Sequence, residues 1–249
     1  LKKINNLGIG PAGLGGKYNL SGGEHKLSSY PYSWTSRSSK YLLSRCPTCR
    51  RNIIENNNFK SGSKFMKEST KITTPLNEEK VIQLKAGDFV NITGYIYAAR
   101  DAAHKRIFEL IKKGQKLPIE LKGQIIFYAG PTPAKSGYPC GSVGPTTSYR
   151  MDLYTPPMLD RGLKGMIGKG YRSGEVIESM KKNKAVYFGA VGGAAALIAR
   201  RFKKSEVIAY EDLGAEAIYQ FYVEDFPAIV VIDSAGNNLY ETEPLKYMK

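Results

Sequence analysis

Cysteine, acidic residues and long apolar runs are all scarce in this chain, and each shortage excludes a class of protein. Three cysteines in 249 residues are too few for a disulfide scaffold and suit a reducing compartment. No apolar run approaches the roughly 20 residues that a membrane-spanning helix needs. The opening residues, LKKINNLGIG, lack the apolar segment of a signal peptide. We therefore expect no membrane partner and a cytoplasmic location, or the mitochondrial matrix if the source is eukaryotic.

The shortage of acidic residues leaves a net charge of +15, with 37 basic and 22 acidic side chains. The imbalance is concentrated at the start: residues 1–70 contain 12 basic and 3 acidic residues, whereas residues 71–249 contain 25 and 19. A basic arm can bind nucleic acid or an acidic partner. No RNA- or DNA-binding motif accompanies the charge, so we interpret it as a solvated surface or a contact with an acidic partner subunit. Nucleic acid is not an expected partner.

Residues 1–70 are rich in Ser, Asn, Gly and Lys, and their hydrophobic periodicity is weak. The stretch NNNFKSGSKFMKESTK at 56–71 has the composition of a linker. From Ile72 onwards the pattern is regular. We therefore predict an N-terminal segment at 1–55, a linker at 56–71 and one domain at 72–249, a length that supports a sizeable hydrophobic core.

The regular part alternates between strand and helix patterns. Residues 88–99 alternate polar with β-branched and aromatic side chains, which predicts a strand, and residues 101–113 have helical spacing after an acidic start. Ser173 is the expected N-cap of another helix. Further strands are predicted at 124–129, 184–189, 217–224 and 228–233, and further helices at 173–182 and 190–202. Such alternation indicates a compact α/β domain.

The most informative stretch is GPTTSYRMDLYTPPMLDRGLKGMIGKG at 144–170, where we predict loops too rich in glycine to form core. Thr146 and Thr147 follow Gly-Pro, which lets backbone and hydroxyl groups approach a ligand closely. Arg150 offers a planar fork suited to a carboxylate. Lys169 lies between two glycines, where little else would block a substrate. Hydroxyl, fork and point charge together predict a pocket for a small anion that carries several carboxylates.

Six blocks of the domain form one ordered set of motifs. They read PLNEEKVIQLKAGDFVNITGYIYAARDAAHKRI (75–107), GQIIFYAGPTP (123–133), GPTTSYRMD (144–152), GMIGKGYRS (165–173), AVYFGAVGGAAALIA (185–199) and YEDLGAEAIYQFYVEDFPAIVVIDSAGN (210–237). In sequence and order they resemble the β component of the iron–sulfur hydro-lyases, the family of class I fumarase and L-tartrate dehydratase. The resemblance implies a swivelling β/β/α fold and either reversible hydration of fumarate to malate or dehydration of tartrate.

Within these blocks the resemblance assigns roles residue by residue. Arg100, in AARDAAH, matches the arginine that holds a substrate carboxylate, and Arg150 matches the arginine for the second carboxylate. Lys169 matches the pocket lysine, and Thr146 matches the threonine that exchanges a proton with the substrate carbon. A threonine hydroxyl is a weak base, so neighbouring cations would have to activate it. Thr146 and Lys169 are thus the expected catalytic residues, and all four are expected to contact the dicarboxylate substrate.

Other residues of the same motifs receive structural interpretations. Asp101 and His104 fit the RDAAH pattern and are expected to support the start of the helix. Tyr149 stands where the family usually has glycine, which bears on the loop shape and on substrate preference. Structural alternatives also exist for the site: Arg100 as a surface arginine that caps a strand, and Thr146 as a hydroxyl that stabilises a turn.

Residues 1–55 contain three shorter motifs, namely GIGPAGLGGK (8–17), HKLSSYP (25–31) and CPTCRR (46–51). These resemble the end of the α component of the same family. The likeness implies that Cys46 is one ligand of a [4Fe–4S] cluster with an open iron, and that Cys49 and Cys140 are not ligands. The other cluster cysteines would come from an α component or from a missing N-terminal domain, in a dimer of such units.

Other interpretations stay open beside the hydro-lyase. One is a catalytically inactive, family-derived subunit of a larger assembly, and another is a truncated product, since the chain begins at Leu1. The glycines of GIGPAG match GxGxxG, but they lack the flanking strand, helix and acidic residue of a dinucleotide-binding fold. CPTC provides half of a zinc site, yet Cys140, His25 and His104 lack zinc-knuckle spacing.

Overall fold

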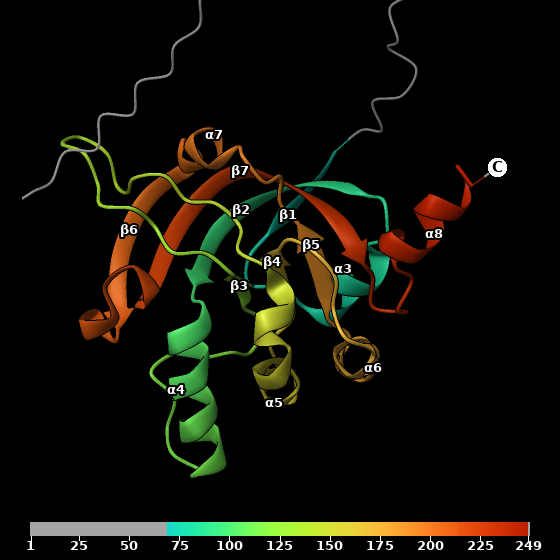
Figure 1. Cartoon of the computed structure of the whole chain (residues 1–249), viewed down its shortest axis with the longest axis horizontal. Coiled ribbons are helices and arrows are strands. Elements are labelled where there is room, and N and C mark those ends of the chain that lie inside the picture. Colours follow the sequence, from blue (N-terminus) through green and yellow to red (C-terminus); the bar gives the residue numbers. More distant parts are fainter. Residues whose placement is uncertain (1–68, 249) are drawn as a thin grey trace, which may run out of the picture. The chain divides into compact units, whose positions relative to one another are not determined.

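The computed structural model describes residues 69–248, which belong to one unit with a mixed sheet and flanking helices (Figure 1). The sheet contains seven strands in the order β1-β2-β3-β4-β5-β7-β6. The strands are β1 (Thr70–Thr73), β2 (Phe89–Ala98), β3 (Ile125–Phe127), β4 (Gly165–Gly168), β5 (Val186–Gly189), β6 (Phe202–Ala209) and β7 (Ile218–Ile232). The helices are α3 (Glu78–Gln83), α4 (Asp101–Lys112), α5 (Thr155–Leu159), α6 (Gly174–Asn183), α7 (Ala195–Ala199) and α8 (Leu239–Leu245), with 3-10 turns η2 (Ser148–Tyr154) and η3 (Glu211–Glu216).

Two long strands organise the sheet. β2 pairs with β7 in antiparallel fashion along its length, from Phe89 opposite Ile229 to Ala98 opposite Tyr219. The other edge of β2 pairs in parallel with β1 and then with β3. The parallel series continues from β3 to β4 and β5, and β5 pairs with the end of β7. Strands β2, β3, β4, β5 and β7 therefore close a ring, and the carboxyl ends of β2 to β5 meet at one edge.

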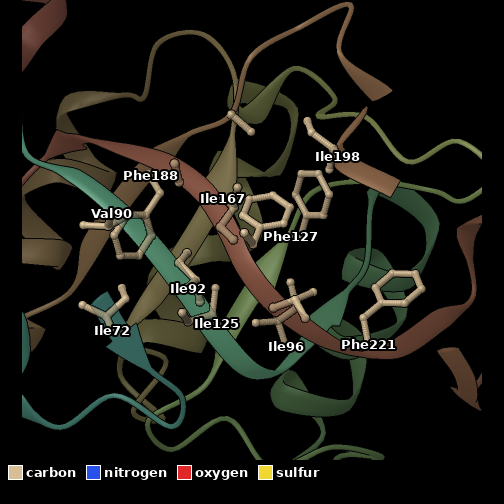
Figure 2. Packing of buried hydrophobic residues seen from close by; sticks show 14 of the residues in the cluster. Ile72, Val90, Ile92, Ile96, Ile125, Phe127, Ile167, Phe188, Ile198 and Phe221 are labelled. Carbon is tan, nitrogen blue, oxygen red and sulfur yellow. The ribbon is translucent and has the colours of Figure 1, made fainter. Parts of the chain in front are cut away.

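The alternation of side chains along the strands separates two hydrophobic clusters. Ile125 and Phe127 of β3 point into the cluster that the ring of strands encloses, with residues from β1, β2, β4, β5, β7 and α7 (Figure 2). Ile126 and the adjoining Tyr128 point the other way, into the cluster shared with helices α4, α5 and α6. Those three helices lie together on one side of the sheet (Figure 1). A strand with both faces buried is continuously apolar, which explains the run IIFYA.

The local signals of the sequence place the main elements correctly. The strand predicted at 88–99 is β2 and the helix predicted at 101–113 is α4. Ser173 is the N-cap of α6, where its hydroxyl accepts a hydrogen bond from the amide of Val176. Lys184 ends that helix in the left-handed conformation. The α/β class is therefore confirmed, because cap residues and periodicity act within a few neighbouring residues.

Three predictions of secondary structure are wrong. The helix expected at 190–202 is only the short α7, because Gly192 and Gly193 form a turn before it and Phe202 already begins β6. The two strands expected at 217–224 and 228–233 are one strand, β7, which continues through Pro227. β1 starts at Thr70, two residues before Ile72, where the sequence pattern becomes regular.

The expectation that 144–170 lies wholly outside the core is also wrong. Gly165–Gly168 is the fully buried parallel strand β4, between β3 and β5. Glycine is needed there for close packing: a Cβ atom on Gly168 would lie 2.0 Å from the hydroxyl of Ser148, and one on Gly165 would lie 2.8 Å from Ile125. The glycines thus admit neighbouring side chains rather than loosen a loop. In the part of the chain described, no helix is long and apolar enough to cross a membrane.

Candidate functional site

The predicted site residues follow the carboxyl ends of neighbouring parallel strands, where polar groups of a sheet commonly meet a ligand. Arg100 comes two residues after the end of β2, and Lys169 comes directly after β4. The loop with Thr146 is held beside the end of β3, because its amide donates to the carbonyl oxygen of Tyr128 at 2.7 Å. The amide of Ser148 donates to the carbonyl of Lys169 at 2.9 Å. Segments far apart in sequence therefore meet at one edge of the sheet.

Three of the four predicted residues belong to one network, in which Asp101 joins Arg100 to Arg150 and Arg150 contacts Thr146. One oxygen of Asp101 accepts a hydrogen bond from Nη2 of Arg150 at 2.7 Å and from Nε of Arg100 at 3.3 Å. The same Nη2 of Arg150 donates to the hydroxyl of Thr146 at 2.8 Å. Side chains of both arginines and of Asp101 are 30–39% exposed. The network is therefore open to solvent and to a ligand.

Two nitrogens of the Arg100 guanidinium are available to a ligand. Its Nε contacts Asp101 and also lies 3.3 Å from an oxygen of Glu216. The terminal Nη1 and Nη2 atoms have no hydrogen-bond partner among residues 69–248. Because those two nitrogens donate in the geometry that matches a carboxylate, Arg100 is able to bind one from the open side.

Lys169 differs from the arginines in having no acidic partner in the described part of the chain. Its side chain is exposed and its backbone bridges to Thr147. The next residue, Gly170, has φ = 84°, a left-handed conformation that glycine adopts without strain. The chain thereby turns away after Lys169, and its ammonium group stays free to meet an anion.

A buried ion pair lies beneath this surface. The Arg172 side chain is fully buried, and its Nε donates to Asp152 at 2.7 Å. Its terminal nitrogens donate to the hydroxyls of Thr155 at 2.8 Å and Tyr128 at 3.2 Å. Burial lowers the pKa of Arg172, but Tyr128 and Asp152 outweigh it and the net pKa is raised, so the guanidinium stays charged. The other oxygen of Asp152 accepts the amide of Ser173 at 2.6 Å.

This pair connects η2, which carries Arg150, to the segment that follows Lys169. The sequence analysis missed both Arg172 and Asp152. The arginine immediately before a helix N-cap was the available signal, but nothing local distinguishes it from a surface residue. Glu216 was missed for the same reason, since it reaches Arg100 from the connection between β6 and β7.

His104 is completely buried below Arg100, and its Nδ1 lies 3.0 Å from the carbonyl oxygen of Arg100. Burial lowers the pKa of His104 to about 4, so the ring is neutral at pH 7. A carbonyl oxygen only accepts, so Nδ1 carries the proton and donates it. Nε2 has no partner among the described residues. The geometry agrees with the expected supporting role of His104 at the helix start.

The described residues do not provide ligands for an iron–sulfur cluster. The predicted ligand Cys46, like Cys49 and His25, lies outside them. Cys140 is a core side chain, and burial raises the pKa of its thiol to about 11, so it stays a thiol rather than the thiolate that binds metal. No group of three or more His, Cys, Asp or Glu side chains within the described range is placed to hold a metal ion.

An apolar groove of about 620 Å³ lies elsewhere, between α7 and strands β2 and β7. Phe89, Leu197 and Ile229 are among its lining residues, and none of the predicted site residues lines it. Its lining is mostly apolar but includes Arg200 and Arg201. The predicted site is instead an open surface, with Tyr149 65% exposed beside Arg150.

Comparisons with known proteins match the part of the chain that contains these residues. A family model described as "Fumarase C-terminus" matches residues 48–243. The anaerobic class I fumarate hydratase of Escherichia coli is 42% identical over 154 residues, which are 61% of this chain and 28% of that protein. Fumarate hydratase 2 of Leishmania major is 39% identical over 164 residues, 65% of this chain and 29% of its own length. The chain thus spans less than a third of these relatives.

A shorter relative is matched over most of its own length. A Methanocaldococcus jannaschii protein, provisionally named as the beta subunit of L(+)-tartrate dehydratase, is 38% identical over 172 residues. The match covers 67% of this chain and 88% of that subunit. Arg100, Thr146, Arg150 and Lys169 all lie inside the region that the family model matches.

Proposed function

Because the chain belongs to the fumarase C-terminus family, we propose that it carries the substrate-binding half of a hydro-lyase that adds water to, or removes water from, a small dicarboxylic acid. The observation that carries this proposal is the convergence of Arg100 and Arg150 on one carboxylate oxygen beside Thr146. Asp101 occupies the position that an anionic ligand would favour. Fumarate, malate and tartrate each carry two carboxylates, which such a surface is suited to bind.

The arginines would orient the substrate. The free terminal nitrogens of Arg100 would receive one carboxylate, and Arg150, with Lys169, would receive the other. Holding both ends in a defined geometry removes translational and rotational freedom before the reaction, which lowers the barrier. Three cations against the two carboxylates of Asp101 and Glu216 leave the surface with the positive charge that a dianion needs.

Thr146 would exchange a proton with the substrate carbon. Its hydroxyl oxygen accepts a hydrogen bond from the cationic Arg150, which stabilises negative charge that develops on that oxygen. Its own O–H has no acceptor within residues 69–248, so it is free to turn towards a ligand. This arrangement provides the activation that a threonine needs in order to act as an acid or base.

The remaining chemistry would come from outside the described residues. In this proposal Cys46 is one ligand of a [4Fe–4S] cluster, and an α component or a missing N-terminal domain supplies the others and the opposite wall of the site. Such a cluster would supply a Lewis acid for the substrate hydroxyl. The exposure of the arginine network supports an incomplete site that a second component covers. The proposal also includes the family's swivelling β/β/α fold, which the closed ring of strands, with α4, α5 and α6 on one side of it, supports.

The test combines iron content with a matched pair of arginine variants. The native complex is isolated without oxygen, and iron, sulfide, fumarate hydration and tartrate dehydration are measured. We expect about four irons per chain and turnover of one of these acids. Arg150→Ala should reduce turnover at least about 10³-fold, because it removes a preorganised cation. Arg161→Ala, at an exposed arginine just after the end of α5 whose side chain hydrogen-bonds only to the carbonyl of Pro157 among the described residues, is the control and should retain activity.

Two outcomes would contradict the proposal. Near-normal activity of Arg150→Ala would show that Arg150 does not belong to the active site. A native complex without iron and without turnover would favour the alternative, a catalytically inactive subunit of a larger assembly or a truncated product. The meeting of Arg100, Arg150 and Thr146 in one hydrogen-bonded network favours the enzyme.

A further inference from the structure

Glu216 contacts the candidate site from η3, the 3-10 turn between β6 and β7. One of its carboxylate oxygens lies 3.3 Å from Nε of Arg100. The other oxygen accepts a hydrogen bond from the amide of Ala102 at 2.9 Å, in the first turn of α4. An anionic group at a helix N-terminus is favourable because the first amides lack partners there. A single side chain therefore holds both Arg100 and the helix that follows it.

The position of the contact on the guanidinium is informative. Glu216 and Asp101 both approach Nε, which is the inner edge of the group, and leave the two terminal nitrogens free among the described residues. An arginine side chain has several rotatable bonds, and ordering it costs about 2 kcal/mol of rotamer entropy. A carboxylate that already holds Nε orders the side chain before any ligand binds, so less rotamer entropy is lost on binding. The two terminal nitrogens are consequently left for a ligand.

The turn that carries Glu216 is itself anchored. Arg106 of α4 donates to Asp212 of η3 at 2.8 Å and lies over the ring of Tyr210 at 5.1 Å. The carbonyl oxygen of Ala215 packs so closely on Gly130 that a Cβ atom there would lie 2.4 Å from it. These contacts hold η3 against α4 and against the end of β3. The carboxylate of Glu216 is therefore placed by packing, not only by its attraction to Arg100.

We propose that Glu216 is a positioning residue that fixes the direction of the Arg100 guanidinium through Nε. The consequence for substrate binding rests on the proposed function, in which Arg100 binds a carboxylate. Glu216→Gln preserves an oxygen that can accept the amide of Ala102 but removes the charge that faces Nε. We therefore expect the substrate to bind more weakly, while the chemical step changes little. The expected result is a rise in KM of about tenfold with kcat within about threefold.

The first experiment observes Arg100 directly and needs no substrate. The full chain is labelled with ¹⁵N-arginine, and the Nε–H signal of Arg100 is identified by its loss in Arg100→Lys. We expect slow solvent exchange of this proton in the wild-type chain and exchange at least about tenfold faster in Glu216→Gln. The melting temperature should fall by less than about 4 °C. Glu211→Gln, an exposed glutamate in the same turn, is the matched control and should resemble the wild type.

The outcomes separate this inference from the proposed function. Equal exchange rates in Glu216→Gln and the wild type would overturn the positioning role, whatever the activity of the complex. Faster exchange in Glu216→Gln, with Glu211→Gln unchanged, would support it even in a complex that turns over no dicarboxylate. In that case only the proposed function would fail. In an active complex, a fall in kcat without a rise in KM would also overturn the positioning role.

Discussion

Two arginine–aspartate pairs lie at the same edge of the sheet and have opposite properties. Arg172 and Asp152 are buried, with 0% and 11% of their side chains exposed, and every part of the guanidinium contacts a partner. Arg150 and Asp101 are more than a third exposed. The Arg100 that shares Asp101 keeps two nitrogens without partners in the described residues. A buried guanidinium whose three nitrogens all have partners stabilises a fold, whereas an exposed one with free nitrogens is available to a ligand.

Burial explains why the two pairs cannot exchange roles. A buried charge must be well paired, because desolvation is costly, and the fully buried Arg172 is out of reach of a substrate. An exposed pair gains little from its own attraction and tolerates free donors, because water solvates them until a ligand arrives. The same reasoning covers His104, whose buried ring is hydrogen-bonded only to a backbone carbonyl among the described residues and stays neutral. The comparison predicts effects on stability for one region and on binding for the other.

The largest expected effect is on the buried pair. Arg172→Met should lower the free energy of unfolding by about 3–5 kcal/mol, since it leaves the carboxylate of Asp152 without its cation in a nearly dry site. The exposed counterpart, Arg150→Met, should cost less than about 1 kcal/mol. Denaturant unfolding of both variants measures the difference. Equal losses of stability would show that burial does not separate the two pairs.

The second prediction concerns binding. Lys169→Met should lower kcat/KM for the dicarboxylate about 10²- to 10³-fold, because it removes a cation aimed at the substrate. Its stability should stay unchanged, as Lys169 has no acidic partner within residues 69–248. Steady-state kinetics of the complex, with the exposed Lys135→Met as a control, provide the measurement. If Lys169→Met lowered the stability but left kcat/KM unchanged, Lys169 would support the fold and not the substrate.

The third prediction concerns pH. The pKa of His104 is about 4 in the folded chain and about 6.5 when unfolded, so the unfolded state binds more protons between these values. Stability is therefore complete above pH 6.5 and is lost as the pH falls towards 4. We expect the free energy of unfolding to fall by about 2 kcal/mol between pH 7 and pH 5. His104→Gln should remove this slope, and an identical slope in that variant would contradict the assignment.

The smallest effect tests a local contact. Ser173→Ala removes the N-cap of α6, whose hydroxyl accepts from Val176 at 3.4 Å, and should cost about 1 kcal/mol. Thermal unfolding measures it, and Ser173→Asp should restore most of the loss. Activity should be unaffected, because Asp152 accepts the Ser173 amide through the backbone, which the substitution leaves in place. Loss of activity without loss of stability would link the cap to the site.

Much of the fold could be predicted where the signal was local. The alternating pattern of 88–99 and the amphipathic pattern of 101–113 each lie within one element, and Ser173 acts on residues next to it. The errors came where neighbours in space decided. The chain after Arg200 enters a strand because β7 is beside it, and Gly165–Gly168 is core because β3 and β5 flank it. Such pairings join residues that no short window of sequence contains.

The candidate site shows the same division. The sequence motifs identified Arg100, Thr146, Arg150 and Lys169 as candidate residues. Three of them meet in one network in the structure. The sequence alone determined the α/β class, the Ser173 cap and the place of Arg100 between a strand and a helix, because these depend on periodicity and immediate neighbours. Only the tertiary structure decided that Arg172 is buried, that Arg150 shares Asp101 with Arg100, and that Glu216 stands behind Arg100. Burial and ion pairing depend on distances between segments that the folded sheet alone brings together.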